Sequence, residues 1–338
     1  MHAQNGTHNS RVSGEFHNLG TINLSTKPKE TMTMKKSATK KTDLKSVPAT
    51  NKKSVSDVIT EAIISKLEAG IIPWKKPWNG SSNQPKNLIT GKAYRGINAF
   101  LLANTEFVSP YFLTFRQVQE KKGLVNAGAK SFPVVFWSMV RGSDQETDSE
   151  KEIPLMKFYR VFSVEQTSLP IPAFTEEPLD FNPIEKADRI VANMPCAPEI
   201  RHGQAKAYYS PSLDYVNMPA RELFHSSEEY YNVLFHELTH SVGSIKRLGR
   251  KGVIETSYFG SHEYSKEELV AEMGACFMCG ELGVTPATID NSVANIQSWL
   301  RVLKSKDNRN LIVSAASQAQ KSFDYILDRQ PVALAEVE

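Results

Sequence analysis

Two histidines four residues apart, with a glutamate between them, carry the clearest chemistry in this 338-residue sequence: residues 236–240 read HELTH. A spacing of four places both imidazoles on one face of a helix, where they can bind one Zn²⁺ ion. Glu237 then lies where a carboxylate can act as general base on a water at the metal. The motif predicts a hydrolytic site for zinc, or another divalent metal, with ligands His236 and His240 and with Glu237 as the catalytic residue.

A site of this type needs a third protein ligand. The metzincin pattern requires a histidine six residues after the second one, but Lys246 stands there. The gluzincin pattern requires a glutamate on a following helix, and Glu268 and Glu272 lie one helical turn apart. We expect Glu268 to be the third ligand and Glu272 to accept a hydrogen bond from a ligand imidazole. If Glu268 instead caps its helix together with Ser265, Glu272 becomes the ligand.

Helices must position these groups. Ser226 and Glu229 have the spacing of a capping box, which predicts the start of a helix that ends near Gly243. Within it the apolar positions gather on the side opposite the two histidines, so the apolar stripe is expected to face the core and the imidazoles a cleft. Residues 184–330 therefore read as a mainly helical domain that carries the metal site.

Charge and composition divide the chain. Residues 1–53 hold 10 lysines and arginines against 3 acids and lack apolar periodicity, which predicts a disordered basic arm. Residues 167–338 hold 16 against 23, and four prolines within 167–183 indicate a linker. Between arm and linker, helical spacing over 56–69 and strand-like runs at 134–137 and 158–162 predict an α+β domain over 54–166.

The cellular compartment is predicted from sequence features that the chain lacks. No run approaches the roughly 18 apolar residues of a membrane helix, and the first thirty residues contain no apolar segment typical of a secretion signal. Three cysteines cannot form a disulfide framework, which favours a reducing environment. We expect a soluble, cytoplasmic protein with no membrane partner.

The α+β domain interleaves aromatic residues with cations. Bases of single-stranded nucleic acid stack on aromatic rings while lysines and arginines follow the phosphates, so this composition predicts a site for single-stranded nucleic acid. The same pattern would also arise from core tryptophans beside solvated lysines. The candidate contacts are Trp74, Lys75, Lys76, Trp78, Lys92, Tyr94, Arg95, Asn98 and Arg116.

Several runs extend this interpretation. Residues 90–98 (TGKAYRGIN) and 160–166 (RVFSVEQ) resemble the N-terminal single-stranded-DNA-binding domain of the ArdC family of plasmid antirestriction proteins. Residues 235–240 (FHELTH) and 267–272 (EELVAE) resemble that family's zincin-like metallopeptidase domain. The resemblance implies two domains of α+β class, with a gluzincin-type C-terminal domain. It also implies binding of single-stranded DNA during conjugation and protection of incoming DNA from restriction.

Two other functions fit the same residues. The chain could be a non-enzymatic DNA-binding protein with a vestigial or structural zinc site, but a structural site does not require Glu237. It could also be a proteolytic effector that cleaves a protein or peptide substrate without DNA. Hydrolysis measured with and without DNA separates the three.

Overall fold

The computed structural model describes residues 53–74, 83–143, 150–173, 183–255, 262–284, 293–305, 308 and 310–330. The arm predicted for 1–53, except residue 53, and the candidate DNA contacts Lys75, Lys76 and Trp78 lie outside these residues. The predicted linker is described only at 167–173 and 183. Among the described residues, no helix combines the length and apolar character needed to cross a bilayer.

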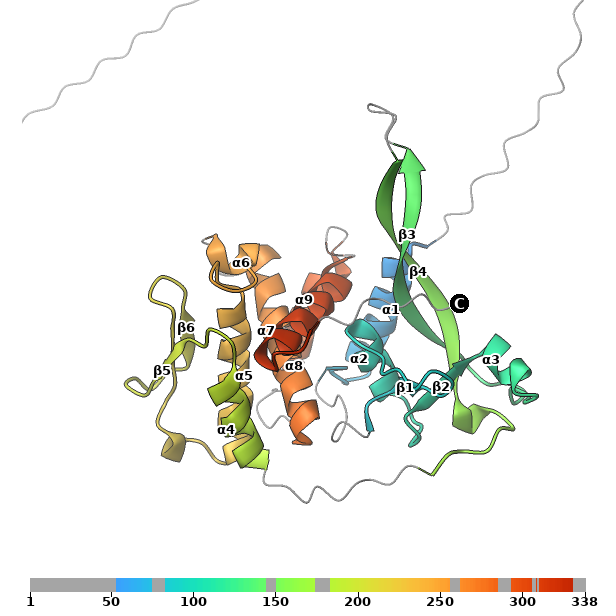
Figure 1. The fold of residues 1–338 in the computed structure, drawn as a ribbon, viewed down its shortest axis with the longest axis horizontal. Coiled ribbons are helices and arrows are strands. Elements are labelled where there is room, and N and C mark those ends of the chain that lie inside the picture. Colours follow the sequence, from blue (N-terminus) through green and yellow to red (C-terminus); the bar gives the residue numbers. More distant parts are fainter. Residues whose placement is uncertain are drawn as a thin grey trace, which may run out of the picture. The chain divides into compact units, whose positions relative to one another are not determined.

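The first half contains a four-stranded sheet in the order β1-β2-β4-β3 (Figure 1). Its strands are β1 Lys86–Asn87, β2 Tyr111–Thr114, β3 Phe132–Ser143 and β4 Glu150–Ser163. β1 pairs with β2 in parallel, and the other pairs are antiparallel. Pairing of β2 with β4 stops at Thr114 opposite Val161, whereas β3 and β4 stay paired as far as Ser143 opposite Glu150. The two long strands, β3 and β4, therefore continue past the sheet as a two-stranded arm, which is a different segment from the basic arm predicted for residues 1–53.

Short helices accompany this sheet because the local sequence caps them. α1 (Val55–Glu68) begins at a capping box of Ser54 and Asp57. A second capping box, formed by Thr114 and Gln117, starts α3 (Phe115–Glu120). α2 (Ile97–Ala103) follows Gly96, whose φ of +56° favours glycine. Among the described residues, Val164–Gln166 and Arg221–Leu223 form short 3₁₀ turns.

The second half is mainly helical, with one small sheet. Its strands, in the order β5-β7-β6, are β5 Glu199–Arg201, β6 Tyr208–Ser210 and β7 Tyr215–Asn217. Its helices are α4 Pro183–Asn193, α5 Ser227–Val242, α6 Lys251–Ile254, α7 His262–Leu282, α8 Val293–Lys304 and α9 Leu311–Ile326. This arrangement confirms the predicted α+β class with a mainly helical C-terminal part.

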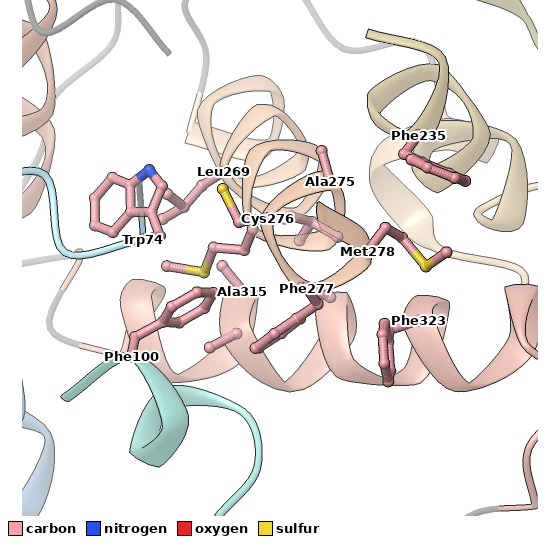
Figure 2. Packing of buried hydrophobic residues seen from close by; sticks show 14 of the residues in the cluster. Trp74, Phe100, Phe235, Leu269, Ala275, Cys276, Phe277, Met278, Ala315 and Phe323 are labelled. Atoms are coloured by element: carbon pink, nitrogen blue, oxygen red, sulfur yellow. The ribbon is translucent and has the colours of Figure 1, made fainter. Parts of the chain in front are cut away.

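The two halves share one hydrophobic core. Ile59 and Ile63 of α1 and Phe100 of α2 belong to the same buried cluster as the apolar faces of α5, α7 and α9. Phe100 stacks on Phe277 of α7 with ring centroids 4.5 Å apart (Figure 2). A smaller cluster, Tyr94, Leu102, Phe112, Val134 and Val161, lies within the first half. Separating the halves would expose much of the main cluster to water, so experiments on either function should use the full chain.

Two candidate DNA contacts are buried, which corrects the sequence prediction for them, and two others bond to residues of this chain. Trp74 is 0% exposed and Tyr94 only 7%, so neither ring offers a face to a base. Arg95 forms an ion pair with Asp324 of α9. Asn98 Oδ1 accepts from Val135 N (2.8 Å) and its Nδ2 donates to Val135 O (2.7 Å). Arg95 thus ties the loop before α2 to α9, and Asn98 ties α2 itself to β3.

Asn98 is expected to contribute to stability. Asn98→Ala leaves the N–H and C=O of buried Val135 without partners, which should cost about 1–3 kcal/mol of unfolding free energy. Lys92→Ala is the matched control, because Lys92 belongs to the same motif but is exposed. Urea unfolding of both variants measures the difference. Equal midpoints for the two would contradict the structural role of Asn98.

Candidate metal centre

Helix α5 presents the HExxH motif. Ser226 caps the helix by accepting a hydrogen bond from Glu229 N (3.2 Å), and Gly243 ends it. Leu234, Phe235 and Leu238 are buried in the main core. The two histidines lie on the other side of the helix and line a pocket, as the periodicity predicted.

Helix α7 supplies the facing carboxylate because it approaches α5 very closely. A Cβ added at Gly274 would lie 2.5 Å from Thr239 Oγ1 and 3.1 Å from Thr239 Cβ. Only glycine fits there without a shift of one helix. The close contact brings Glu268, a turn and a half earlier on α7, opposite the histidines.

Three donor groups meet at one point. The Nε2 atoms of His236 and His240 are 3.2 Å apart. Glu268 Oε2 lies 3.6 Å from His236 Nε2, and its Oε1 lies 3.8 Å from His240 Nε2. Ligands at about 2.0–2.2 Å from a tetrahedral zinc are separated by roughly 3.4 Å, so the spacing fits a divalent cation. Within the described residues, these three are the group whose geometry could hold a metal ion.

The local electrostatics also suit a cation. Burial alone would lower the pKa of His236, but Glu268, Glu237 and Glu272 outweigh that effect and raise it. Acidic side chains around one imidazole favour the binding of a cation. Glu237 is only 9% exposed and borders the pocket between the two histidines.

A carboxylate that sequence reasoning missed holds His240. Glu267 Oε1 lies 3.2 Å from His240 Nδ1, the ring nitrogen that faces away from the donor cluster. Arg250 binds the same carboxylate through two hydrogen bonds. Its Nε donates to Oε2 at 3.0 Å, and its Nη2 donates to Oε1 at 2.5 Å. Burial alone would raise the pKa of Glu267, but the hydrogen bonds with His240 and Arg250 keep it below its usual range. Glu267 therefore stays ionised and orients the imidazole.

Arg250 in turn connects three helices. Besides Glu267 of α7, it donates to Thr239 O of α5 (2.6 Å) and to Ser322 Oγ of α9 (2.7 Å). Gly243 leaves room for this arrangement, because a Cβ there would lie 3.0 Å from Arg250 Nη2 and 2.4 Å from Val253 Cγ2. No local pattern marks Arg250, which lies 17 residues before Glu267, so the network depends on the tertiary fold.

Glu272 has a different environment from the one expected. Its Oε2 accepts a hydrogen bond from Trp74 Nε1 at 2.9 Å, across the boundary between the two halves. Burial raises the pKa of Glu272 to about 7, although the Trp74 hydrogen bond opposes the rise. Glu272 is near enough to raise the pKa of His236. Its predicted role as acceptor for a ligand imidazole stays a prediction.

The pocket has a volume of about 810 Å³. The three donors and Glu237 form part of its wall, and Tyr208 and Tyr209 of β6 form another part. Ile245 and Ile254 add apolar surface beside the donors. Lys246, where a metzincin would have its third histidine, instead pairs with Asp214 at 3.0 Å.

The remaining candidate DNA contacts lie on the surface. Lys92 is exposed. Arg116 is exposed and pairs with Glu120 at 2.8 Å, one helical turn away. Among the candidate contacts that the structure describes, these two are the exposed ones, and their role in binding DNA stays a prediction.

Two family models match the chain. One, described as the N-terminal domain of the anti-restriction factor ArdC, matches residues 53–162. The other, described as a zincin-like metallopeptidase, matches residues 185–318.

Solved structures and curated proteins resemble the chain over most of its length. The antirestriction protein ArdC of plasmid R388 is 36% identical in its metal-free crystal structure, with TM-score 0.65 and coverage of 82% of this chain and 97% of that one. Its Mn(II)-bound structure is 35% identical, with TM-score 0.65 and coverage of 82% and 98%.

Among curated proteins, y4eC of Sinorhizobium fredii is 32% identical, covering 80% of this chain and 91% of that protein. A DNA primase TraC of Escherichia coli is 32% identical over 82% of this chain, but the match spans only 20% of the primase.

The contact between Gly274 and Thr239 gives a direct test of how the centre is built. Gly274→Ala should destabilise the protein by about 1–3 kcal/mol and weaken metal binding, because α7 must move away from α5. Thr239→Ala removes Oγ1 and Cγ2, the two atoms closest to the added Cβ, so Gly274→Ala should cost much less in the double variant. Unfolding and metal titration of the four proteins form a double-mutant cycle. Strictly additive costs would show that the two helices do not depend on this contact.

Proposed function

Because the chain belongs to the ArdC family of antirestriction proteins, we propose that it protects incoming DNA, binds single-stranded DNA and carries a metal-dependent peptidase site. In this proposal residues 54–166 contribute the DNA-binding domain, 167–183 a linker and 184–330 the metallopeptidase domain. The protein would act in the cytoplasm on DNA that enters by conjugation.

The convergence of His236, His240 and Glu268 carries the enzymatic part of the proposal. Two imidazoles and one carboxylate form the donor set of catalytic zinc sites, so we assign these residues as ligands and Zn²⁺ as the metal. The Mn(II)-bound structure of the R388 relative supports a divalent cation. A metal held there would polarise a carbonyl group and lower the pKa of a water molecule.

The surrounding residues suit hydrolysis. Glu237 lies on the pocket wall beside the donors and can take a proton from the attacking water and deliver it to the leaving amine. Glu267 keeps His240 in one orientation and one tautomer. A structural site would need neither an open pocket nor a carboxylate within it, so both features favour an enzyme that cleaves a protein or peptide.

Glu237 separates the peptidase from a pure binding protein. Glu237→Gln keeps the size of the side chain but removes the base, so hydrolysis of a peptide library should disappear while metal content and single-stranded DNA binding stay at wild-type levels. The assay should be run with and without DNA, since DNA binding could control the peptidase. Glu255→Gln changes another acidic residue of the pocket wall and serves as the control.

A conjugation assay decides whether hydrolysis serves protection. If the peptidase is required, Glu237→Gln should abolish the protection of unmodified plasmid DNA and Glu255→Gln should not. Equal protection by wild type and Glu237→Gln would contradict this, and DNA binding alone would then account for the function.

A further inference from the structure

Exposed aromatic residues occur on the two-stranded arm instead of at Trp74 and Tyr94. Trp137 of β3 is 41% exposed and Phe158 of β4 is 38% exposed. In the register of the hairpin, Trp137 lies opposite Met156 and Phe158 lies opposite Val135. Two residues that lie opposite each other on paired strands point to the same face of a sheet, and so do residues two positions apart on one strand. The two rings are therefore diagonal neighbours on one face.

A cation continues this face. Arg160 lies two positions beyond Phe158 on β4, opposite Pro133. It is exposed, and its Nη1 lies 3.4 Å from Oγ of Ser131, the residue before β3. Lys130 is exposed just before Ser131. Among the described residues, no acidic side chain forms an ion pair with either cation, so both charges are available to an anionic ligand.

The face is not simply the margin of the core. Val135, on the same face, is buried in the main cluster, and Met156 packs against that cluster. Trp137 and Phe158 alternate with them along the arm but keep about two-fifths of their surface exposed. The core thus holds the strands in place while the two large rings face water. Exposed aromatic groups beside exposed cations are typical of an interaction surface.

We propose that Trp137, Phe158 and Arg160, called here the arm face, bind single-stranded DNA, which extends the single-stranded DNA binding proposed above. Unpaired bases stack on the two rings, and Arg160, with Lys130 beside it, contacts the phosphates. A duplex keeps its bases stacked on one another, so the arm face discriminates in favour of single strands. The charge favours nucleic acid over an apolar protein segment, since phosphates complement the cations.

Binding by the full-length protein tests the rings. The probe is a fluorescein-labelled 20-nucleotide thymidine oligomer, followed by anisotropy. Trp137→Ala and Phe158→Ala should each weaken binding by about 5- to 150-fold, the effect of one stacked base. Leu155→Ala and Phe115→Ala remove exposed apolar side chains outside the arm face and should stay within about twofold of wild type. Trp137→Phe retains a ring and should restore most of the affinity.

Salt dependence tests the cation. The slope of log affinity against log salt should fall by about 0.7 in Arg160→Gln, because one phosphate contact is lost. Arg116→Gln is the matched control, since Arg116 already pairs with Glu120 and lies outside the arm face. A lowered slope in Arg116→Gln, with none in Arg160→Gln, would overturn the assignment.

The outcomes distinguish a failure of the arm-face assignment from a failure of the proposed single-stranded DNA binding. If the wild-type protein does not bind the oligomer, the proposed single-stranded DNA binding itself is wrong. If wild type binds and the arm-face variants bind equally well, the function stands and the arm face is not its site. If those variants bind DNA normally but lose protection in the conjugation assay, the face serves a protein partner and the proposal is likewise overturned. Trp137→Phe should also reduce the quenching of tryptophan fluorescence by the oligomer, a readout independent of small changes in stability.

Discussion

The candidate metal centre depends on the close approach of α5 and α7. Gly274 permits this approach by leaving room for Thr239, and the contact fixes where Glu268 lies relative to His236 and His240. The buried Arg250 reinforces it by joining Glu267 on α7 to a carbonyl group of α5 and a hydroxyl group of α9. A buried arginine is tolerated only when its charge and donors are satisfied. Disturbing one partner therefore affects the entire arrangement of helices behind the donors.

The first half of the chain takes part in the same arrangement. Phe100 stacks on α7, and the Trp74 indole donates to Glu272 one turn beyond Glu268. Arg95 extends the contact to α9 through Asp324. The residues that bind the two halves together thus include motifs that sequence reasoning assigned to DNA. The sheet and the candidate metal centre are therefore held in a fixed geometry, because the boundary between the two halves is packed like a domain interior.

The sequence was informative where function follows local periodicity. The four-residue spacing of His236 and His240 sets their common face, and the α+β class followed from strand and helix patterns. The sequence was uninformative where contacts join residues that are far apart in the chain. No pattern near Glu267 predicts that Arg250 binds its carboxylate. The alternation of tryptophan and lysine at Trp74 was ambiguous, because burial and stacking require the same residue type. Tertiary packing determines which tryptophan is available for stacking, because it buries Trp74 and leaves Trp137 exposed. Only the strand register shows that Trp137 shares a face with Phe158 and Arg160.

The most direct test of the account is zinc affinity in two variants of α7. Chelator competition with purified full-length protein should show that Glu268→Gln loses far more affinity than Glu272→Gln. The reason is that Glu268 lies within 3.8 Å of both Nε2 atoms, whereas Glu272 accepts its hydrogen bond from Trp74. If Glu272→Gln loses the metal while Glu268→Gln retains it, the contact between α5 and α7 does not select the third ligand in the way described.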